Sequence, residues 1–464
     1  MFVIFTLLLV WNSVWAQDDL TARMEKVLQS FSKSIQKDQV GLAVLNPESP
    51  EKPLYTLSAE RELIPASVTK LVTAAAVMRR FPPGGKLQTT LWSTAPLENG
   101  VLKGDLILKG GGDPGFVSET MWFLVNELVR SDIRKITGKV IVDDRDFDSV
   151  RTDSSRSPER VDRAYDAPIG AMSFNWNSIN IYIRPGKTGK APIVYLDPIP
   201  NGYKITNKAK TVSGSGNGLA VSREGEKIVV SGKLGAKSDE VVFYKNIDDP
   251  AEWSARSLIF FLKQRGIEIG KDFALGSTPD KARLLAKADS KPVQQLVADM
   301  LKFSNNYVAE MLTKDLAMMN GEKPATLDGG MKIINSTLEE MGVPADRFKL
   351  INPSGLSREN RMRPLDLALV LVKGFQHFPT FAEYLSALPL AGIDGTLKSR
   401  MKNTPAQGWV RAKTGLLTGA VALAGFAGRK DGSVRAFAFI FNGKGEQGDS
   451  ARKLFDALAA ELVQ

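Results

Sequence analysis

The chain has 464 residues, more than one ordinary hydrophobic core accommodates, so two or three domains are expected. The absence of cysteine excludes disulfides, a thiol nucleophile and a Cys-ligated metal, and the single histidine, His377, excludes a multi-His metal site. The net charge of +10 is dispersed and no Lys/Arg cluster is interleaved with aromatic residues, so nucleic acid is not expected as a partner.

Residues 1–16 read MFVIFTLLLVWNSVWA, and the apolar run over 2–11 has the length of a signal-peptide core. The run is too short to span a bilayer, and Val-Trp-Ala at 14–16 resembles a small-x-Ala cleavage site. No Lys or Arg precedes the run, so either the start is misassigned or the α-amino group alone supplies the positive end. A buried N-terminal helix or strand is the alternative, but the polar residues at 17–19 favour a signal peptide and export. In an exported protein the positive charge fits an anionic envelope, with at most peripheral membrane contact.

The remaining sequence divides into three regions that differ in their predicted helix, strand and turn content. The first, 20–80, holds an amphipathic stretch at 20–35, a strand at 40–45 and a helix that starts near Pro65. The second, 88–280, is rich in turns, and strands are predicted at 104–108, 139–142, 179–183 and 227–230. The third, 290–464, has helices at 293–301 and 307–319, strands at 420–428 and 434–441, and a last helix. This order predicts an α/β domain built from both chain ends and carrying a large β-rich insertion.

The last predicted helix, 451–463, has apolar residues at helical spacing: Leu454, Phe455, Leu458 and Leu462. A membrane-surface anchor would place basic residues on the polar face, but this polar face is mixed in charge. We therefore expect the helix to cover a sheet.

Three short motifs, S-x-x-K, S-x-N and K-T-G, occur together in penicillin-binding proteins and class A β-lactamases, but each alone is weak. S-x-x-K starts at six serines: Ser30, Ser34, Ser49, Ser67, Ser399 and Ser450. S-x-N starts at four serines: Ser173, Ser178, Ser215 and Ser304. K-T-G starts at two lysines: Lys187 and Lys413. Physical context has to select among them.

The context favours Ser67 as a nucleophile. It follows Pro65, a residue favoured in the first turn of a helix, and nearly all residues at 71–78 are apolar. The helix dipole at this end favours developing negative charge. Lys70 lies one turn on, on the same face, where loss of hydration favours the neutral amine that can act as a base. A plain helix cap is the alternative reading of Ser67.

The other two motifs are selected in the same way. Ser304 and Asn306, in the same triplet, fall between two predicted helices, where a break in the helix can expose polar side chains to a substrate. A cluster of helix-capping residues is the alternative interpretation of the same triplet. Lys413 ends a predicted strand, and a lysine on an edge strand can bind a carboxylate, while Gly415 lets a substrate backbone approach. The order Ser67, Ser304, Lys413 is the decisive observation.

With these motifs in place, the sequence resembles the class C low-molecular-mass penicillin-binding proteins, the serine D-Ala-D-Ala carboxypeptidase/endopeptidase family. Longer blocks along nearly the whole chain share the likeness: 102–108 with Gly-Asp-Pro at 112–114, 142–148, Ala-Pro at 167–168 with Asn175 and Asn177, 354–358 and 392–397. The resemblance implies a β-lactamase/transpeptidase-like α/β domain, an antiparallel sheet flanked by helices, with two nested β-rich insertion domains. The catalytic domain would comprise 17–88 and 281–464, the first insertion 89–115 and 190–280, and the nested one 116–189.

The resemblance also implies a mechanism without metal or cofactor. Ser67 would attack the D-Ala-D-Ala carbonyl of a peptidoglycan stem peptide, and Lys70 would take its proton. Ser304 and Asn306 would relay protons and hold the substrate amide. β-Lactam antibiotics would acylate Ser67 as inhibitors.

Substrate binding is implied for the strand that carries the third motif. Lys413 and Thr414 would hold the terminal carboxylate, and the N–H groups of Ser67 and Leu416 would form the oxyanion hole. Leu416 stands where the family often has Thr or Ser, so a hydroxyl contact is lost. Arg358 is a candidate partner for a substrate carboxylate.

Two further departures concern specificity. Asn-Pro at 352–353 replaces the Asp-Gly that many members carry before Ser-Gly-Leu-Ser, and 157–163 replaces a Trp-rich segment whose acidic residue reads the substrate side chain. Asp162 is a candidate substitute for that acidic residue. A related acyl-serine hydrolase, such as a β-lactamase or an esterase, and an inactive envelope-binding module are the alternatives to a DD-peptidase.

Overall fold

The computed structural model of the chain describes residues 19–155, 163–198 and 202–464. The predicted signal peptide at 1–16 and the candidate Asp162 lie outside these residues. The chain forms two compact units. One comprises Met1–Gly85, Val293–Ala309 and Leu327–Gln464, and the other comprises Lys86–Pro292 and Glu310–Thr326.

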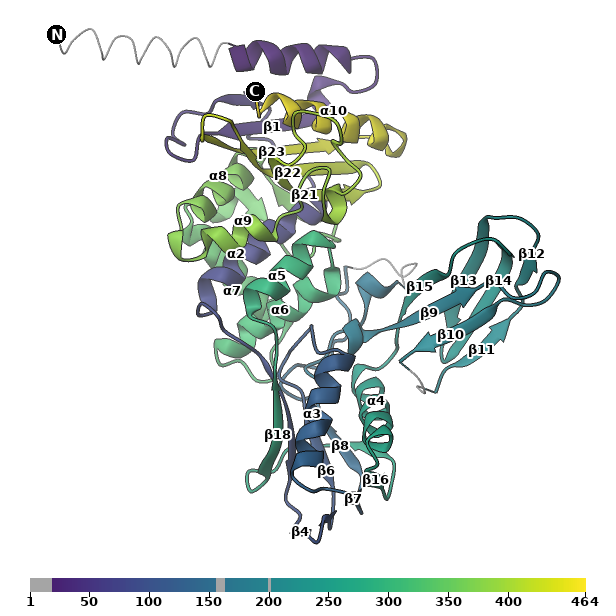
Figure 1. Cartoon of the computed structure of the whole chain (residues 1–464). Helices are drawn as coiled ribbons and strands as arrows, with labels where there is room; N and C mark the ends of the chain where they lie inside the picture. The colour runs from purple at the N-terminus through teal and green to yellow at the C-terminus, as the bar shows by residue number, and fades with distance from the viewer. Residues whose placement is uncertain (1–18, 156–162, 199–201) are drawn as a thin grey trace. The chain divides into compact units, whose positions relative to one another are not determined.

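The first unit is built on a five-stranded sheet in the order β2-β1-β23-β22-β21, antiparallel throughout (Figure 1). Its strands are β1 (Val40–Leu45), β2 (Tyr55–Leu57), β21 (Val410–Leu417), β22 (Ala420–Gly428) and β23 (Val434–Asn442). All six residues of β1 are buried, which explains its unbroken apolar sequence. β21 forms one edge of the sheet.

Helices cover both faces of this sheet. A helix at 19–30 and α10 (Gly448–Glu461) share one core with β1, β22 and β23. The prediction that the last helix covers a sheet is confirmed, because Leu454, Phe455 and Leu458 are fully buried in that core. On the other face α8 (Pro364–Phe375) packs against β1, where a Cβ atom on Gly41 would lie 2.7 Å from Pro364 Cγ. Small residues on this face thus let a helix approach closely.

Five further helices are α2 (Lys70–Arg80), α5 (Val293–Lys302), α6 (Asn306–Met319), α7 (Leu327–Glu340) and α9 (Phe378–Ala387). In the first unit, α2 packs against α5, α7, α8 and α9. This packing explains why the helix that follows Ser67 is apolar on all sides. A short hairpin, β19 (Phe348–Lys349) with β20 (Arg361–Met362), frames the loop between them. Among the described residues, no helix combines the length and apolarity needed to cross a membrane.

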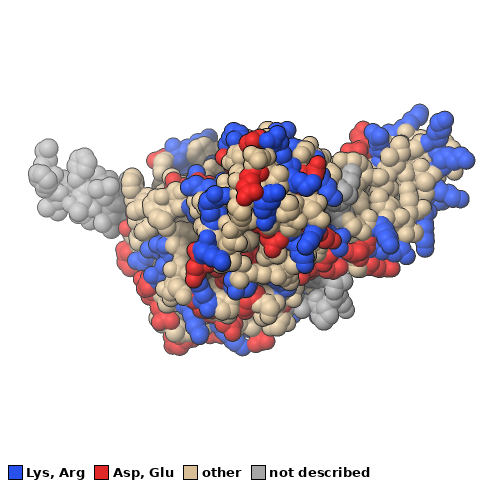
Figure 2. Space-filling view, turned by 90° about the horizontal axis from the view of Figure 1, so that it is seen from below, with Lys and Arg blue, Asp and Glu red and all other residues tan. Residues whose placement is uncertain are grey.

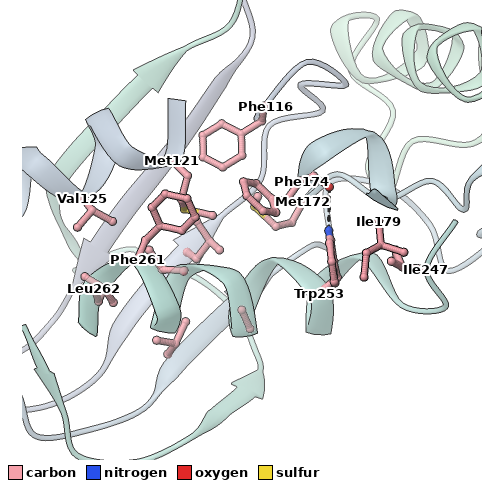
Figure 3. Packing of buried hydrophobic residues seen from close by; sticks show 14 of the residues in the cluster. Phe116, Met121, Val125, Met172, Phe174, Ile179, Ile247, Trp253, Phe261 and Leu262 are labelled. Atoms are coloured by element: carbon pink, nitrogen blue, oxygen red, sulfur yellow. Dashed lines mark hydrogen bonds between the residues drawn. The ribbon is translucent and has the colours of Figure 1, made fainter. Parts of the chain in front are cut away.

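The second unit contains a five-stranded sheet in the order β17-β8-β6-β3-β18 and a four-stranded sheet in the order β16-β7-β5-β4. Their strands are β3 (Gln88–Ser93), β4 (Leu97–Glu98), β5 (Val101–Leu102), β6 (Leu106–Lys109), β7 (Lys135–Ile136), β8 (Val140–Asp143), β16 (Glu268–Ile269), β17 (Phe273–Leu275) and β18 (Arg283–Asp289). Helices α3 (Ser118–Arg130) and α4 (Pro250–Gln264) enclose an aromatic core. In that core Trp253 Nε1 donates a hydrogen bond of 2.9 Å to Phe174 O (Figure 3).

Two further sheets of the second unit form a β-sandwich. One has the order β10-β9-β15, from β9 (Ser178–Arg184), β10 (Ile193–Asp197) and β15 (Val241–Asn246). The other joins β11 (Lys204–Asn207), β12 (Lys210–Val212) and β13 (Asn217–Glu224) to β14 (Lys227–Gly235). Ile181 and Ile183 of the first sheet and Ile228 and Val230 of the second are fully buried in a shared core.

Strand pairing divides the insertion at other residues than those expected. β8 lies within 116–189, the segment expected to form the nested domain, yet it pairs with β6 and β17 from outside that segment. β9 also lies within 116–189 but pairs with β10 and β15 beyond it. The expected limits at 115/116 and 189/190 therefore do not coincide with the edges of sheets.

Candidate active site

Ser67 lies in a tight turn that leads into α2. Residues Ala66–Thr69 form a 3-10 turn, and α2 begins directly afterwards at Lys70. Ala66 has a φ of +49°, a conformation that costs a residue with a side chain about 1–3 kcal/mol and persists where the surroundings enforce it. The turn therefore holds Ser67 in a fixed, half-buried position at the start of a buried helix.

Lys70 is fully buried, and its Nζ atom has three oxygen partners. It lies 3.2 Å from Ser67 Oγ, 2.6 Å from Asn306 Oδ1 and 2.5 Å from the carbonyl oxygen of Ser354. An amine held in this way beside a hydroxyl can accept the hydroxyl proton.

The S-x-N triplet forms the break between two helices, as predicted. α5 ends at Lys302 and α6 begins at Asn306, and Ser304 between them has a φ of +55°. This break turns Asn306 toward Lys70 and Ser304 toward Lys413, whose Nζ atom donates a 2.8 Å hydrogen bond to Ser304 Oγ. The sequence-selected serines and lysines thus meet in one place.

The K-T-G triplet lies on the edge strand β21. Lys413 is fully buried, and burial together with the nearby charge of Lys70 holds the pKa of the Lys413 amine well below its ordinary value of 10.5. Its Nζ atom also lies 2.6 Å from Thr414 O. A Cβ atom on Gly415 would lie 2.9 Å from Pro65 O, so only glycine lets β21 run this close to the turn that carries Ser67.

Three residues of the site had no role assigned from the sequence. Asn352 is fully buried, and its Oδ1 atom accepts hydrogen bonds from the backbone N–H groups of Ser354 and Leu356, which fixes the carbonyl that Lys70 contacts. Thr396 Oγ1 accepts a 2.9 Å hydrogen bond from Thr414 Oγ1. The blocks at 354–358 and 392–397 contain two of these residues, but only a family likeness marked them. The contact made by Ser354 is through its backbone, which no residue type reveals.

Two predicted binding residues lie on the surface of the first unit. Leu416 is 58% exposed on β21. Arg358 is exposed and its Nη2 atom donates a 2.5 Å hydrogen bond to Thr418 O, just beyond the end of β21. Arg358 is therefore near the same edge strand, but no contact with Ser67 or Lys70 is described.

The competing motif copies have structural surroundings instead. Ser30 Oγ donates to Val27 O within its helix, and Ser173 Oγ donates to Gly170 O in a buried loop of the second unit. Lys187 is exposed in the connection between β9 and β10. Within the described part of the chain, no group of three or more His, Cys, Asp or Glu side chains is arranged to hold a metal ion.

The sequence profile of the D-Ala-D-Ala carboxypeptidase 3 (S13) family matches residues 20–462. The chain belongs to this family. Among curated S13 relatives, a D-alanyl-D-alanine carboxypeptidase of Actinomadura sp. (strain R39) is 30% identical, with 91% of this chain and 81% of the relative covered. D-alanyl-D-alanine carboxypeptidase DacB of Haemophilus influenzae is 27% identical, with 82% of this chain and 81% of the relative covered.

A solved structure supports the same fold for this S13 chain. Penicillin-binding protein 4 (DacB) of H. influenzae superposes with a TM-score of 0.78 at 23% identity, over 94% of this chain and 98% of that one. The expected α/β penicillin-binding fold is therefore confirmed. As a member of the S13 family, the chain is a serine-type D-Ala-D-Ala peptidase.

Proposed function

We propose that Ser67 is the nucleophile of this peptidase and forms an acyl-enzyme with peptidoglycan stem peptides. The observation that carries the proposal is the position of Lys70 Nζ, 3.2 Å from Ser67 Oγ in a fully buried setting. A serine hydroxyl is inert without a base, and Lys70 is the described basic group in hydrogen-bond reach of it. The helix that begins at Lys70 directs its positive end toward Ser67.

In the acylation step, Ser67 Oγ bonds to the carbonyl carbon of the penultimate D-Ala and its proton passes to Lys70 Nζ. The carbonyl oxygen becomes an oxyanion, which the N–H groups of Ser67 and Leu416 stabilise. The close approach of β21 to the turn of Ser67 at Gly415 supports this pairing of N–H groups. Collapse of the oxyanion breaks the peptide bond, and the terminal D-Ala leaves as an amine after it gains a proton.

Deacylation runs through the same groups. Water loses a proton to Lys70 as its oxygen adds to the acyl carbon, and Ser67 Oγ leaves with a proton. Lys70 is neutral at this stage, because the proton that it took from Ser67 has passed to the leaving amine during acylation. We propose that Ser304, which accepts a hydrogen bond from Lys413, relays that proton.

We assign the terminal carboxylate of the substrate to Lys413 and Thr414. Lys413 is buried beside a second lysine and has no carboxylate partner among the described residues, so an anionic ligand would complete its surroundings. Thr414 Oγ1 donates a hydrogen bond to Thr396 Oγ1, in the 3-10 turn Gly395–Leu397. β-Lactam antibiotics carry a carboxylate at the matching position, and we propose that they acylate Ser67 as inhibitors.

We further propose that the protein works outside the cytoplasmic membrane, because peptidoglycan lies there. The polymer's stem peptides carry carboxylates, which suits a chain of net charge +10. The sequence at 1–16 supports export. No metal or cofactor takes part in the proposed steps.

The test is intact-mass spectrometry after brief treatment with benzylpenicillin, followed by peptide mapping. We expect one covalent adduct on the peptide that contains Ser67, and none in the Ser67→Ala variant. An adduct on Ser30 or Ser173 would refute the assignment. If no adduct forms while the antibiotic disappears from solution, the enzyme turns over the drug as a β-lactamase does.

A further inference from the structure

The outer face of the sheet β10-β9-β15 carries three tyrosine rings. Tyr195 of β10 lies opposite Tyr182 of β9, with ring centroids 6.2 Å apart. Tyr244 of β15 pairs with Asn180, and side chains two residues apart on a strand share a face, so Tyr244 and Tyr182 lie on the same side. Tyr195 is 52% exposed and Tyr244 is 58% exposed. The rings therefore present apolar surface to solvent.

These rings are not needed for the core of the sandwich. The alternate residues of β9, which are Ile179, Ile181 and Ile183, are fully buried on the inner face. Exposed aromatic rings gathered on one face usually mark a binding surface, whereas single exposed apolar residues carry no such meaning. The exposed tyrosine rings on the outer face are thus not explained by the stability of the fold.

Polar groups lie among the rings. Asp197 pairs with Asn180 across the strands, on the outer face. Burial raises the pKa of Tyr182, the charges of Asp197 and Glu240 and the neighbouring Tyr244 raise it further, and a side-chain hydrogen bond from Asn180 opposes the shift. The amide of Asn180 and the carboxylates of Asp197 and Glu240 thus act on Tyr182. Hydrogen-bonding groups therefore alternate with flat apolar surface.

The sandwich is also strongly basic. Residues 184–237 contain ten Lys or Arg and three Asp or Glu. Lys187 and Lys190, in the connection between β9 and β10, are exposed. Figure 2 shows that Lys and Arg predominate over this body, at the right of the view. A polymer that carries carboxylates would be attracted to it.

We propose that this face binds the glycan strand of peptidoglycan, with Tyr195, Tyr182 and Tyr244 stacking on sugar rings. The C–H groups of a pyranose ring pack on the face of an aromatic ring, and Asn180 and Asp197 can hydrogen-bond the hydroxyl and acetamido groups at the ring edge. The Lys and Arg residues of the sandwich attract the carboxylates of stem peptides. The identity of the polymer rests on the proposed function, whereas the existence of a saccharide site does not.

The size of the face favours a saccharide over a protein. Strands are spaced about 4.8 Å apart, so three strands span about 10 Å, roughly the length of one disaccharide unit. A stable protein interface buries about 800 Å² on each partner, several times what three rings and their neighbours offer. Such a site would hold the enzyme on the polymer while its active site works on stem peptides.

The test is co-sedimentation with insoluble sacculi, in the Ser67→Ala background so that the polymer is not cut. We expect the double variant Y195L/Y244L to bind at least tenfold more weakly, because leucine keeps apolar area but loses the ring face. Y195F/Y244F, which keeps the rings, is expected to bind like the parent. F378L, which removes an aromatic side chain that is 92% exposed in the first unit, is the control for nonspecific loss.

Two further measurements separate the alternatives. Glycan strands from which an amidase has removed the stem peptides are expected to bind the parent and not Y195L/Y244L. With Ser67 restored, all variants are expected to hydrolyse a short soluble D-Ala-D-Ala peptide at equal rates. Unchanged sedimentation of Y195L/Y244L, or binding that needs the stem peptides and vanishes with salt alone, would overturn the proposal. A failure of peptide hydrolysis in the parent would refute the peptidase mechanism without touching the binding result.

Discussion

The Nζ atom of Lys413 lies 2.8 Å from the Oγ atom of Ser304, in a site where Lys413 is fully buried. Burial and the charge of Lys70 hold the pKa of this amine well below its ordinary value. In the free enzyme, the buried surroundings of Lys413 thus disfavour the protonated form of its amine. A bound carboxylate reverses this balance, because an opposite charge favours the protonated amine. This balance is the basis for the proposal that Lys413 binds a substrate carboxylate.

Removal of this amine is expected to affect free-acid substrates most. In Lys413→Ala, kcat/KM for a peptide ending in a free carboxylate is expected to fall at least about tenfold further than for its C-terminal amide, since a hydrogen bond to a charged group contributes about 1.5–3 kcal/mol. The measurement compares both substrates in parallel, with the exposed Lys402→Ala as control. Equal losses on the two substrates would contradict the assigned role.

The same lysine is expected to lower the stability of the protein. Its folded-state pKa lies below the ordinary 10.5, so the unfolded chain binds the proton more tightly. The resulting cost is absent above pH 10.5, builds as the pH falls toward the folded-state pKa and is constant below it. We expect Lys413→Met to raise the free energy of unfolding at pH 7 by about 1–2 kcal/mol, within the usual range for such relief. Thermal unfolding measures it. Lys402→Met is the exposed control, and a gain that persists above pH 11 would refute the explanation.

A buried carboxyl pair in the second unit predicts a different pH dependence. Asp315 is fully buried, neither of its carboxyl oxygens has a hydrogen-bond partner among the described residues, and burial and nearby Asp113 raise its pKa well above 3.8. Burial likewise raises the pKa of Asp113 to about 7. Because both folded-state values are raised, stability is full below about pH 4 and is lost as the pH rises through the folded-state values.

We therefore expect Asp315→Asn to be more stable than the wild type at pH 8, by about 1–3 kcal/mol, with the difference vanishing near pH 4. Chemical denaturation across this range measures the effect. Asp280→Asn changes an exposed carboxylate of the same unit and serves as the control. A stability difference that grows toward acid pH would show that Asp315 is ionised in the folded protein.

Gly415 is expected to tolerate no side chain. A methyl group there would lie 2.9 Å from Pro65 O and 3.2 Å from the Cβ atom of Ala66, so β21 or the turn of Ser67 has to move. A displacement of about 1 Å at a reacting group can reduce the rate about 100-fold. We expect Gly415→Ala to slow acylation by benzylpenicillin by that order. Gly218→Ala, on a strand with room for the methyl group, is the control, and normal acylation of Gly415→Ala would show that the strand adapts freely.

The sequence predicted the position of individual strands better than it predicted which strands pair with each other. The strand at 40–45 has the predicted ends, and the predicted strand at 420–428 is β22, because continuous apolar runs mark strands buried on both faces. Such a run does not reveal which strand pairs with it. The limits expected within the insertion, for example, separate β8 from β6 and β17, with which it pairs.

For the site, side-chain chemistry was more informative than backbone geometry. The sequence selected Ser67, Lys70 and Lys413 from competing motif copies, and the structure brings them together with Ser304 and Asn306. It gave no role to Ser354, whose contribution is a carbonyl oxygen that any residue could supply. The buried amide of Asn352 that positions this carbonyl was noticed only as a departure from the family pattern.

The pairing of β1 with β23 has a consequence for the order in which the protein matures. Val40 lies opposite Phe441. The inner strand β1 of the catalytic sheet therefore cannot pair with β23 until the far end of the chain has been synthesised. During synthesis, no active site can assemble until residue 442 has emerged, and contacts of such high sequence separation slow folding. A chain that stays incomplete for so long is suited to passage through a membrane in an extended form.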